Sequence, residues 1–192
     1  MKALAICGSP RENGNTEFLL RRCLDRLKAG GLDVELVRLG ALRILPCKAC
    51  GACAKTKDRT CAQKGDDFQP LFEKMAAADI LITGSPVYFG SATPQLMTLL
   101  DRAGYVARAN GGLLTRKIGG PLVVARRAGH NFTFAQLLLW FMINGMVVPG
   151  SSYWNIAFGR DIGEVQKDEE GLRTMDQFAD NLLWLAGKLR AG

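Results

Sequence analysis

The sequence predicts an α/β fold, a doubly wound five-stranded parallel sheet in the order 2-1-3-4-5 with helices on both faces. Short apolar segments alternate with segments of helical periodicity along the chain, which is the pattern of strands joined by right-handed helical crossovers. Three polar or glycine-rich stretches, at 9–16, 85–92 and 126–131, each follow an apolar segment. Ligands of such sheets bind beyond the carboxyl ends of the strands, so we expect these stretches to form one binding site.

Five segments are predicted to be strands. Residues 2–7 and 118–125 are apolar almost throughout, as expected for parallel strands that helices cover on both faces. Residues 34–39 alternate between apolar and polar side chains, which indicates a strand nearer the edge of the sheet. Residues 79–84 form the third strand in chain order, and we expect a short fifth strand at 146–148.

The helices are predicted from apolar residues that recur at helical spacing. Two of them have recognisable starts. Asp66 and Asp67 can cap and charge one helix, and Thr93 followed by Pro94 is typical of an N-cap and a first helical residue. The expected helices cover about residues 18–29, 68–78, 94–102, 133–143 and 172–189.

Length and composition limit the classes of protein. We expect one domain, residues 1–192, because no linker or internal repeat divides the chain. The net charge is +7, but the basic residues are scattered and lack interleaved aromatic side chains, so we expect no nucleic-acid partner. The longest apolar run, 132–148, is shorter than the ~20 residues of a spanning helix, so we expect no membrane partner. The start of the chain lacks a secretory leader, which favours the cytoplasm.

Residues 8–16, Gly-Ser-Pro-Arg-Glu-Asn-Gly-Asn-Thr, are typical of a tight loop between a strand and a helix. Such a junction directs backbone N–H groups and the positive end of a helix dipole at one point, which suits a phosphate. Ser9, Asn13, Asn15 and Thr16 add side-chain donors. An ordinary strand-to-helix turn is the alternative, and the three loops at one sheet edge favour the phosphate. The loop lacks the glycine spacing of a dinucleotide site and the lysine of a triphosphate site.

Four of the six cysteines, Cys47, Cys50, Cys53 and Cys61, lie in one loop at 44–66. The tight spacing of the first three can direct their thiolates at a single centre, and the fourth can return from the loop. Four thiolates suit a [4Fe-4S] cluster or a structural zinc ion, and the compact Cys-x2-Cys-x2-Cys pattern favours iron and sulfur. Free or disulfide-linked cysteines are a further alternative.

Five motifs carry a family resemblance: the loop at 8–16, the cysteines at 47–61, Asp-Asp at 66–67, Gly-Ser-Pro-Val-Tyr-Phe at 84–89 and Asp-Arg at 101–102. Together they resemble the flavodoxin-like NAD(P)H-dependent FMN reductase superfamily and, within it, the iron-sulfur flavoproteins. The resemblance covers nearly the whole chain and is weakest after residue 150. It implies bound FMN, a [4Fe-4S] cluster, and NAD(P)H as a possible co-substrate.

The resemblance also assigns roles to residues of this chain. Those implied to bind the FMN phosphate are Ser9, Arg11, Asn13, Asn15 and Thr16. Those implied to flank the isoalloxazine ring are Pro86, Val87, Tyr88, Phe89 and Gly90. Those implied to lie near its pyrimidine end are Arg126, Arg127 and Gly129. The cluster ligands would be Cys47, Cys50, Cys53 and Cys61. No side chain is implied to be catalytic, because the chemistry takes place at flavin N5.

The resulting hypothesis is an FMN-dependent oxidoreductase or electron-transfer flavoprotein that passes electrons between FMN and the cluster. Its redox partner is expected to be NAD(P)H, a quinone or a ferredoxin. A homodimer or homotetramer is expected, because the cysteine loop extends beyond the sheet and can reach a neighbouring flavin. The alternatives are a cluster-free NAD(P)H-dependent FMN or quinone reductase, and a non-catalytic electron carrier or zinc-stapled interaction module.

Overall fold

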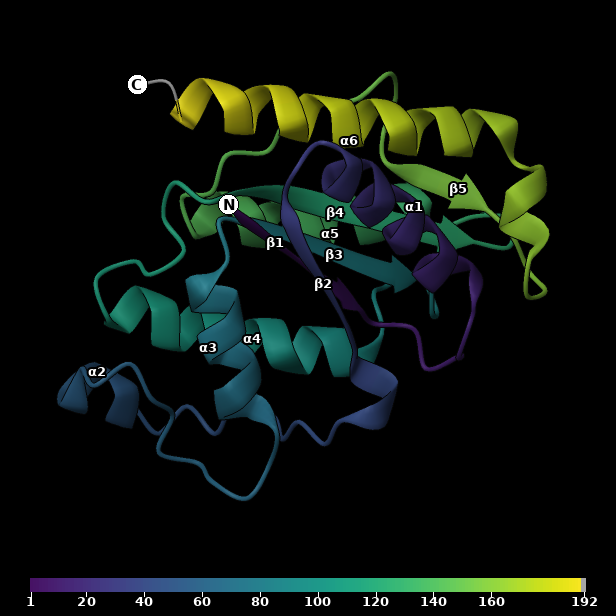
Figure 1. The fold of residues 1–192 in the computed structure, drawn as a ribbon. Coiled ribbons are helices and arrows are strands. Elements are labelled where there is room, and N and C mark those ends of the chain that lie inside the picture. Colours follow the sequence, from purple (N-terminus) through teal and green to yellow (C-terminus); the bar gives the residue numbers. More distant parts are fainter. Residues whose placement is uncertain (191–192) are drawn as a thin grey trace.

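The computed structural model describes residues 1–190. Its centre is a parallel sheet in the order β2-β1-β3-β4-β5, as predicted (Figure 1). All neighbouring strands pair in parallel, so the carboxyl ends of β1, β3 and β4 lie at one edge of the sheet. The strands are β1 (Lys2–Cys7), β2 (Asp33–Arg38), β3 (Ile80–Pro86), β4 (Ile118–Ala125) and β5 (Ile156–Phe158).

Helices cover both faces of this sheet, with α1 and α6 on one face and α3, α4 and α5 on the other (Figure 1). Alternate residues of β1 face opposite layers: Ala3 and Ala5 pack with the first layer, and Leu4 and Ile6 with the second. The helices are α1 (Asn15–Ala29), α2 (Ala52–Thr56), α3 (Phe68–Ala77), α4 (Pro94–Ala109), α5 (His130–Ile143) and α6 (Glu169–Arg190), with short 3₁₀ turns η1 (Leu39–Ala41) and η2 (Glu164–Lys167).

The fifth strand was predicted at 146–148, and this prediction was wrong. Val147 forms only an isolated bridge to Ile118, at the start of β4. Pro149 follows directly and cannot donate to a strand ladder. The last three residues of β4 pair instead with β5, which begins ten residues after the start of the predicted strand. This pairing brings the segment after β5 to the edge where the predicted loops converge.

Two further expectations about helices need correction. The fourth helix, α4, was expected to end near 101–102 but continues to Ala109, because Ala103, Val106 and Ala107 extend its buried face. The segment at 44–66 was expected to be a loop throughout, yet it contains the short helix α2. The longer α4 places its middle, rather than its end, beside the cysteine loop.

The two aspartates before α3 do not cap it as expected. Asp67 is the N-cap residue, but its side chain makes no capping hydrogen bond. Its carboxylate instead accepts the Arg43 N–H at 2.8 Å, and Asp66 accepts the Leu45 N–H at 2.8 Å. The Asp-Asp pair therefore holds the start of the cysteine loop. Thr93 does cap α4, accepting the Leu96 N–H at 3.4 Å, as predicted.

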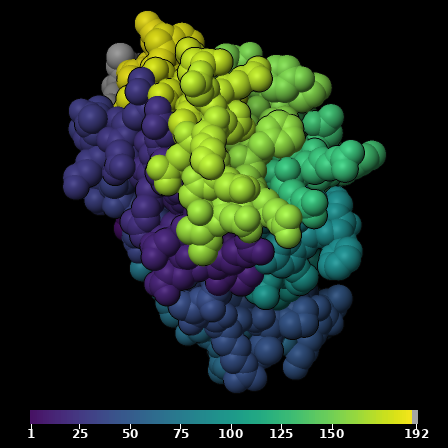
Figure 2. Space-filling view, turned by 90° about the vertical axis from the view of Figure 1, so that its right-hand side faces the viewer, coloured from purple at the N-terminus to yellow at the C-terminus, as the bar shows by residue number. Residues whose placement is uncertain are grey.

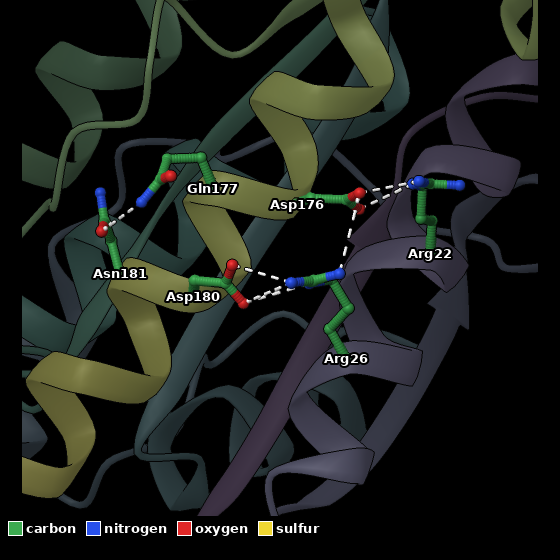
Figure 3. A network of polar contacts seen from close by, with 6 residues as sticks. All are labelled: Arg22, Arg26, Asp176, Gln177, Asp180 and Asn181. Carbon is green, nitrogen blue, oxygen red and sulfur yellow. Dashed lines mark hydrogen bonds and ion pairs between the residues drawn. The ribbon is translucent and has the colours of Figure 1, made fainter. Parts of the chain in front are cut away.

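A ladder of ion pairs aligns α1 with α6 (Figure 3). Arg22 donates to both carboxylate oxygens of Asp176 at 2.7 Å, and Arg26 donates to Asp180 at 2.8 Å. These side chains are partly exposed, so each pair stabilises the fold by only about 0–1 kcal/mol. Their main effect is on the register between the two helices. Within residues 1–190, no helix is long and apolar enough to cross a bilayer.

Candidate functional site

The three predicted loops converge on a cavity of about 250 Å³ at the carboxyl ends of β1, β3 and β4. Figure 2 shows this end of the molecule, where the purple N-terminal segment lies beside the yellow-green segment that follows β5. The cavity is lined by Ser9, Arg11, Asn15, Thr16, Pro86, Val87, Tyr88, Val124, Ala125, Arg126, Gly159 and Arg160.

The first loop presents the amino end of α1 to this cavity. Gly14 is the N-cap residue and offers no side-chain cap, so the first amides of α1 have no partner within the helix. Ser9 is buried, and its hydroxyl accepts the Arg11 N–H at 3.2 Å. Gly84 lies beneath, where a Cβ would come within 2.9 Å of Thr16. The glycine therefore lets the start of α1 sit close to the end of β3.

Glu17 shapes this loop, a role that was not predicted from the sequence. Its carboxylate is almost fully buried and accepts the Asn13 N–H at 3.0 Å, which holds Asn13 at a φ of 52°. Arg21 at 2.7 Å and Arg38 at 3.1 Å pair with the same carboxylate. The two arginines balance a negative charge that would otherwise oppose an anion in the cavity. Asn13 itself is exposed and does not line the cavity.

Asn15 faces the segment after β5. Its amide Nδ2 donates to the Asp161 carbonyl at 2.9 Å, and its Oδ1 accepts the Gly163 N–H at 2.9 Å. Arg11 adds a second link by donating to the Arg160 carbonyl at 2.9 Å. Sequence reasoning missed Gly159 and Arg160 as cavity residues, because nothing in the irregular stretch after residue 150 signals a site.

Only part of the second loop reaches the cavity. Pro86, Val87 and Tyr88 line the cavity, whereas Phe89 and Gly90 do not. These last two form the tip of a tight turn with φ values of 50° and 79°, closed by the bridge between Tyr88 and Ser91. The side chain of Phe89 is fully exposed. Of the residues assigned to the ring, the structure therefore brings three to the cavity and leaves two at the tip.

The third loop brings Arg126 to the cavity and leaves Arg127 exposed outside it. Gly129 does not line the cavity, but it has a φ of 91°, and a Cβ there would lie 2.8 Å from the Val87 side chain. The glycine therefore allows the second and third loops to pack together. Three arginines, at 11, 126 and 160, now surround one opening, which favours an anionic ligand.

The single histidine lies beside the third loop and packs against β5. His130 is buried, and its Nε2 lies 3.1 Å from the Ala157 carbonyl in β5. Its ring packs edge-on against Phe158. Burial lowers the pKa of His130 below its ordinary value, although the contact with Ala157 opposes this shift. His130 does not line the cavity, and its ring connects α5 to β5.

The four loop cysteines line a second cavity, of about 210 Å³, which shares no lining residue with the first. Its wall on the side of the sheet is made by α4 through Arg102, Tyr105 and Val106. In Figure 1 the blue loop that carries the cysteines runs beneath α4. Left-handed backbone at Ala49 and Gly51 turns the chain between the cysteines.

The four thiols are free, and they differ in exposure. Cys47 and Cys50 are exposed, whereas Cys53 and Cys61 are partly buried. Burial raises the pKa of the Cys53 thiol, and the Cys61 and Cys47 thiols raise it further. Nevertheless, no group of three or more His, Cys, Asp or Glu side chains within residues 1–190 is already arranged to hold a metal ion. The loop gathers the thiols around one cavity without drawing them to one point.

Known proteins match this fold and sequence. The family model of NADPH-dependent FMN reductase matches residues 1–161. An iron-sulfur flavoprotein of Methanocaldococcus jannaschii is 34% identical over 91% of this chain and 91% of its own, and one of Methanosarcina thermophila is 34% identical over 95% and 93%. The crystal structure of RosB with bound 8-demethyl-8-formylriboflavin-5′-phosphate has a TM-score of 0.79 at 21% identity, covering 100% of this chain and 81% of RosB.

Proposed function

The chain belongs to the NADPH-dependent FMN reductase family and is an FMN-dependent oxidoreductase, and we propose that it passes electrons between FMN and a [4Fe-4S] cluster. The observation that carries the cluster is the cavity beside α4, which all four loop cysteines line. Two relatives with 34% identity bear the name iron-sulfur flavoprotein. The flavin supplies two-electron and one-electron chemistry at N5 when it is bound.

The cavity at the carboxyl ends of the strands is the proposed FMN site. The unpaired first amides of α1, together with Ser9 and Thr16, would hold the phosphate oxygens. Arg126 would contact the pyrimidine end of the ring, where a positive charge favours the reduced, anionic form. Tyr88 and Val87 would shield the ring from water. Arg11, Asn15 and Pro86 line the same cavity and would also contact the cofactor. The assigned residues that do not line the cavity, Asn13, Phe89, Gly90, Arg127 and Gly129, would act by shaping the three loops or by their charge.

The proposed cluster ligands are Cys47, Cys50, Cys53 and Cys61. Two of these cysteines, Cys47 and Cys50, are exposed, so a cluster could be inserted after folding. Drawing the four sulfur atoms onto one centre requires a local adjustment of the loop, which its short helix and left-handed turns permit.

We further propose a homodimer or homotetramer in a reducing compartment such as the cytoplasm. The two cavities of one chain share no lining residue, so the cysteine loop of one subunit would serve the flavin of another. Exposed apolar side chains on α5, at Leu139, Met142 and Ile143, offer a surface for assembly. Residues 1–192 would form a single FMN-binding domain. The proposed redox partner is NAD(P)H, a quinone or a ferredoxin, and the family name favours NADPH.

Anaerobic purification and reconstitution test this function. We expect the wild-type protein to bind FMN together with equal amounts of iron and sulfide, and a variant with Ser at all four loop positions to bind FMN alone. Cys23→Ala is the matched control, because Cys23 is a buried core cysteine that lines neither cavity. FMN without iron in the wild-type protein would contradict the cluster.

The same preparation separates the alternative functions. Oxidation of NAD(P)H by a quinone, equally fast in the four-serine variant, would indicate a cluster-free reductase. Bound FMN without turnover of any pyridine nucleotide would indicate an electron carrier. Stoichiometric zinc without flavin would indicate an interaction module.

A further inference from the structure

Arg102 is the largest fully buried side chain of the structure. It lies in the middle of α4 and lines the cavity of the four loop cysteines. A guanidinium is rarely buried, because it loses its hydration and remains charged at any physiological pH. The groups that Arg102 contacts therefore indicate its role in the structure.

Those partners all belong to the two ends of the cysteine loop. Arg102 Nη1 donates to the Leu45 carbonyl at 2.9 Å, two residues before Cys47. Its Nη2 donates to the Gln63 carbonyl at 3.2 Å, two residues after Cys61. Both ends of the segment that carries the thiols are thus fixed to one planar group.

An ion pair and an aromatic ring complete this arrangement. Arg102 pairs with Asp66, and both side chains are at most 2% exposed. The guanidinium carbon lies 4.0 Å from the centre of the Phe68 ring. Although burial alone would raise the pKa of Asp66, the Leu45 N–H and Arg102 outweigh it and hold this pKa below its ordinary value. The buried pair therefore stays ionised.

One donor of Arg102 has no partner. Within the part of the chain that the structure describes, its Nε is buried and makes no hydrogen bond. Buried donors without a partner are rare, and each calls for an explanation. Arg102 lines the cavity of the four cysteines, and a cluster sulfide bound there would add an acceptor that the apoprotein lacks.

We propose that Arg102 is a positioning residue for the cysteine site: it joins the two ends of the loop and provides a fixed positive charge behind the thiolates. The effect of the charge rests on the proposed function, because it requires the cluster. The effect on the loop does not, because it is measured in the apoprotein. A planar fork is required to reach both carbonyls, and a positive charge is required to stabilise an anionic centre. Lysine preserves the charge and loses the fork, whereas methionine loses both.

The first experiment measures the loop in the apoprotein. Alkylation of each cysteine in Arg102→Lys and Arg102→Met is followed by mass spectrometry. We expect Cys53 and Cys61, which are partly buried, to react about 10-fold faster than in the wild-type protein, because loss of the hydrogen bonds to a charged group makes local opening of the loop easier. Cys7 and Cys23 are internal controls, because burial raises their pKa values to about 11 and about 12.

Arg108→Met is the matched control variant. Arg108 lies on the same helix but is exposed, and it donates to the Ile143 carbonyl, away from the loop. We expect its alkylation pattern to equal that of the wild-type protein. Unchanged rates at Cys53 and Cys61 in both Arg102 variants would overturn the proposal. Rapid reaction of Cys7 and Cys23 in both would also overturn it, because Arg102 would then support the whole domain and not the loop.

The second experiment measures the effect of the Arg102 charge on the midpoint potential of the cluster. In reconstituted protein, we expect Arg102→Met to shift the midpoint potential of the cluster to more negative values, and Arg102→Lys to keep it near that of the wild-type protein. Equal potentials in all three proteins would refute the charge effect. A wild-type protein that assembles no cluster would contradict the proposed function, whereas the alkylation result would still decide the role of Arg102 in the loop.

Discussion

The side-chain amide of Asn15 binds the backbone of Gly163 across 148 residues of sequence, with Oδ1 accepting the Gly163 N–H at 2.9 Å. The same amide donates to the Asp161 carbonyl at 2.9 Å. One of the two N–H donors of its Nδ2 is thereby used, and Asn15 also lines the proposed FMN cavity. Asn15 therefore stays a proposed phosphate donor, and it also holds the segment that carries Gly159 and Arg160 against the first loop.

We expect Asn15→Ala to lower the free energy of unfolding by about 1–3 kcal/mol, because backbone groups of Asp161, Gly163 and Val165 lose their buried partner. FMN affinity should fall by about tenfold or more, since the cavity wall loosens. Urea unfolding and a fluorescence titration with FMN measure the two effects. Gln166→Ala is the control, because Gln166 is exposed in η2 of the same segment. Wild-type affinity in Asn15→Ala would contradict the inclusion of this segment in the site.

The adjacent arginines of the third loop form a matched pair. Arg126 lines the proposed FMN cavity and Arg127 does not, although both are exposed. We expect Arg126→Ala to weaken FMN binding about tenfold, as for the loss of a charged hydrogen bond, and to make the flavin potential more negative. Arg127→Ala should change both quantities little. A larger effect at Arg127 would show that the loop turns over when the cofactor binds.

The two aromatic residues of the second loop allow a similar comparison. Tyr88 contributes to the cavity, whereas Phe89 is fully exposed in a left-handed turn. We expect Tyr88→Ala to weaken FMN binding by about 1 kcal/mol, which corresponds to lost aromatic packing. Phe89→Ala should leave the affinity unchanged. Isothermal titration calorimetry with FMN provides both values, and equal losses would place Phe89 on the bound ring.

The burial of the single histidine leads us to expect that the stability of the fold depends on pH. Burial depresses the pKa of His130 in the folded protein below the ordinary value of 6.5. Above pH 6.5 the imidazole is neutral in both states, and the fold keeps its full stability. As the pH falls toward the folded pKa, the unfolded chain binds the proton first, so the free energy of unfolding decreases.

Urea unfolding between about pH 7.5 and 5.5 tests this prediction, because carboxylates titrate mainly below that range. We expect the wild-type protein to lose stability on acidification and His130→Gln to lose clearly less. Since the chain has one histidine, no second imidazole obscures the comparison. Parallel curves for the two proteins would contradict it.

The α/β class, the strand order and most element positions could be predicted from local patterns. Residues 2–7 and 118–125 were predicted as strands with the bounds that the structure has, because buried parallel strands are apolar on both faces. The fifth strand was misplaced because an apolar triplet specifies no pairing partner. The end of α4 was predicted too early because Asp101 and Arg102 resemble a polar terminus, whereas only the surrounding packing makes Arg102 a buried residue.

The sequence by itself determined the positions of the three loops that follow strands and the spacing of the four loop cysteines, since both are local properties of the chain. It also carried the family resemblance that predicts FMN. Only the tertiary structure decided which loop residues face a cavity, how Asn15 is used, and what lies behind the thiols. The contacts of Arg102 with Leu45, Gln63 and Asp66 span 57, 39 and 36 positions. Such contacts depend on how the layers pack, and no periodicity in the sequence encodes them.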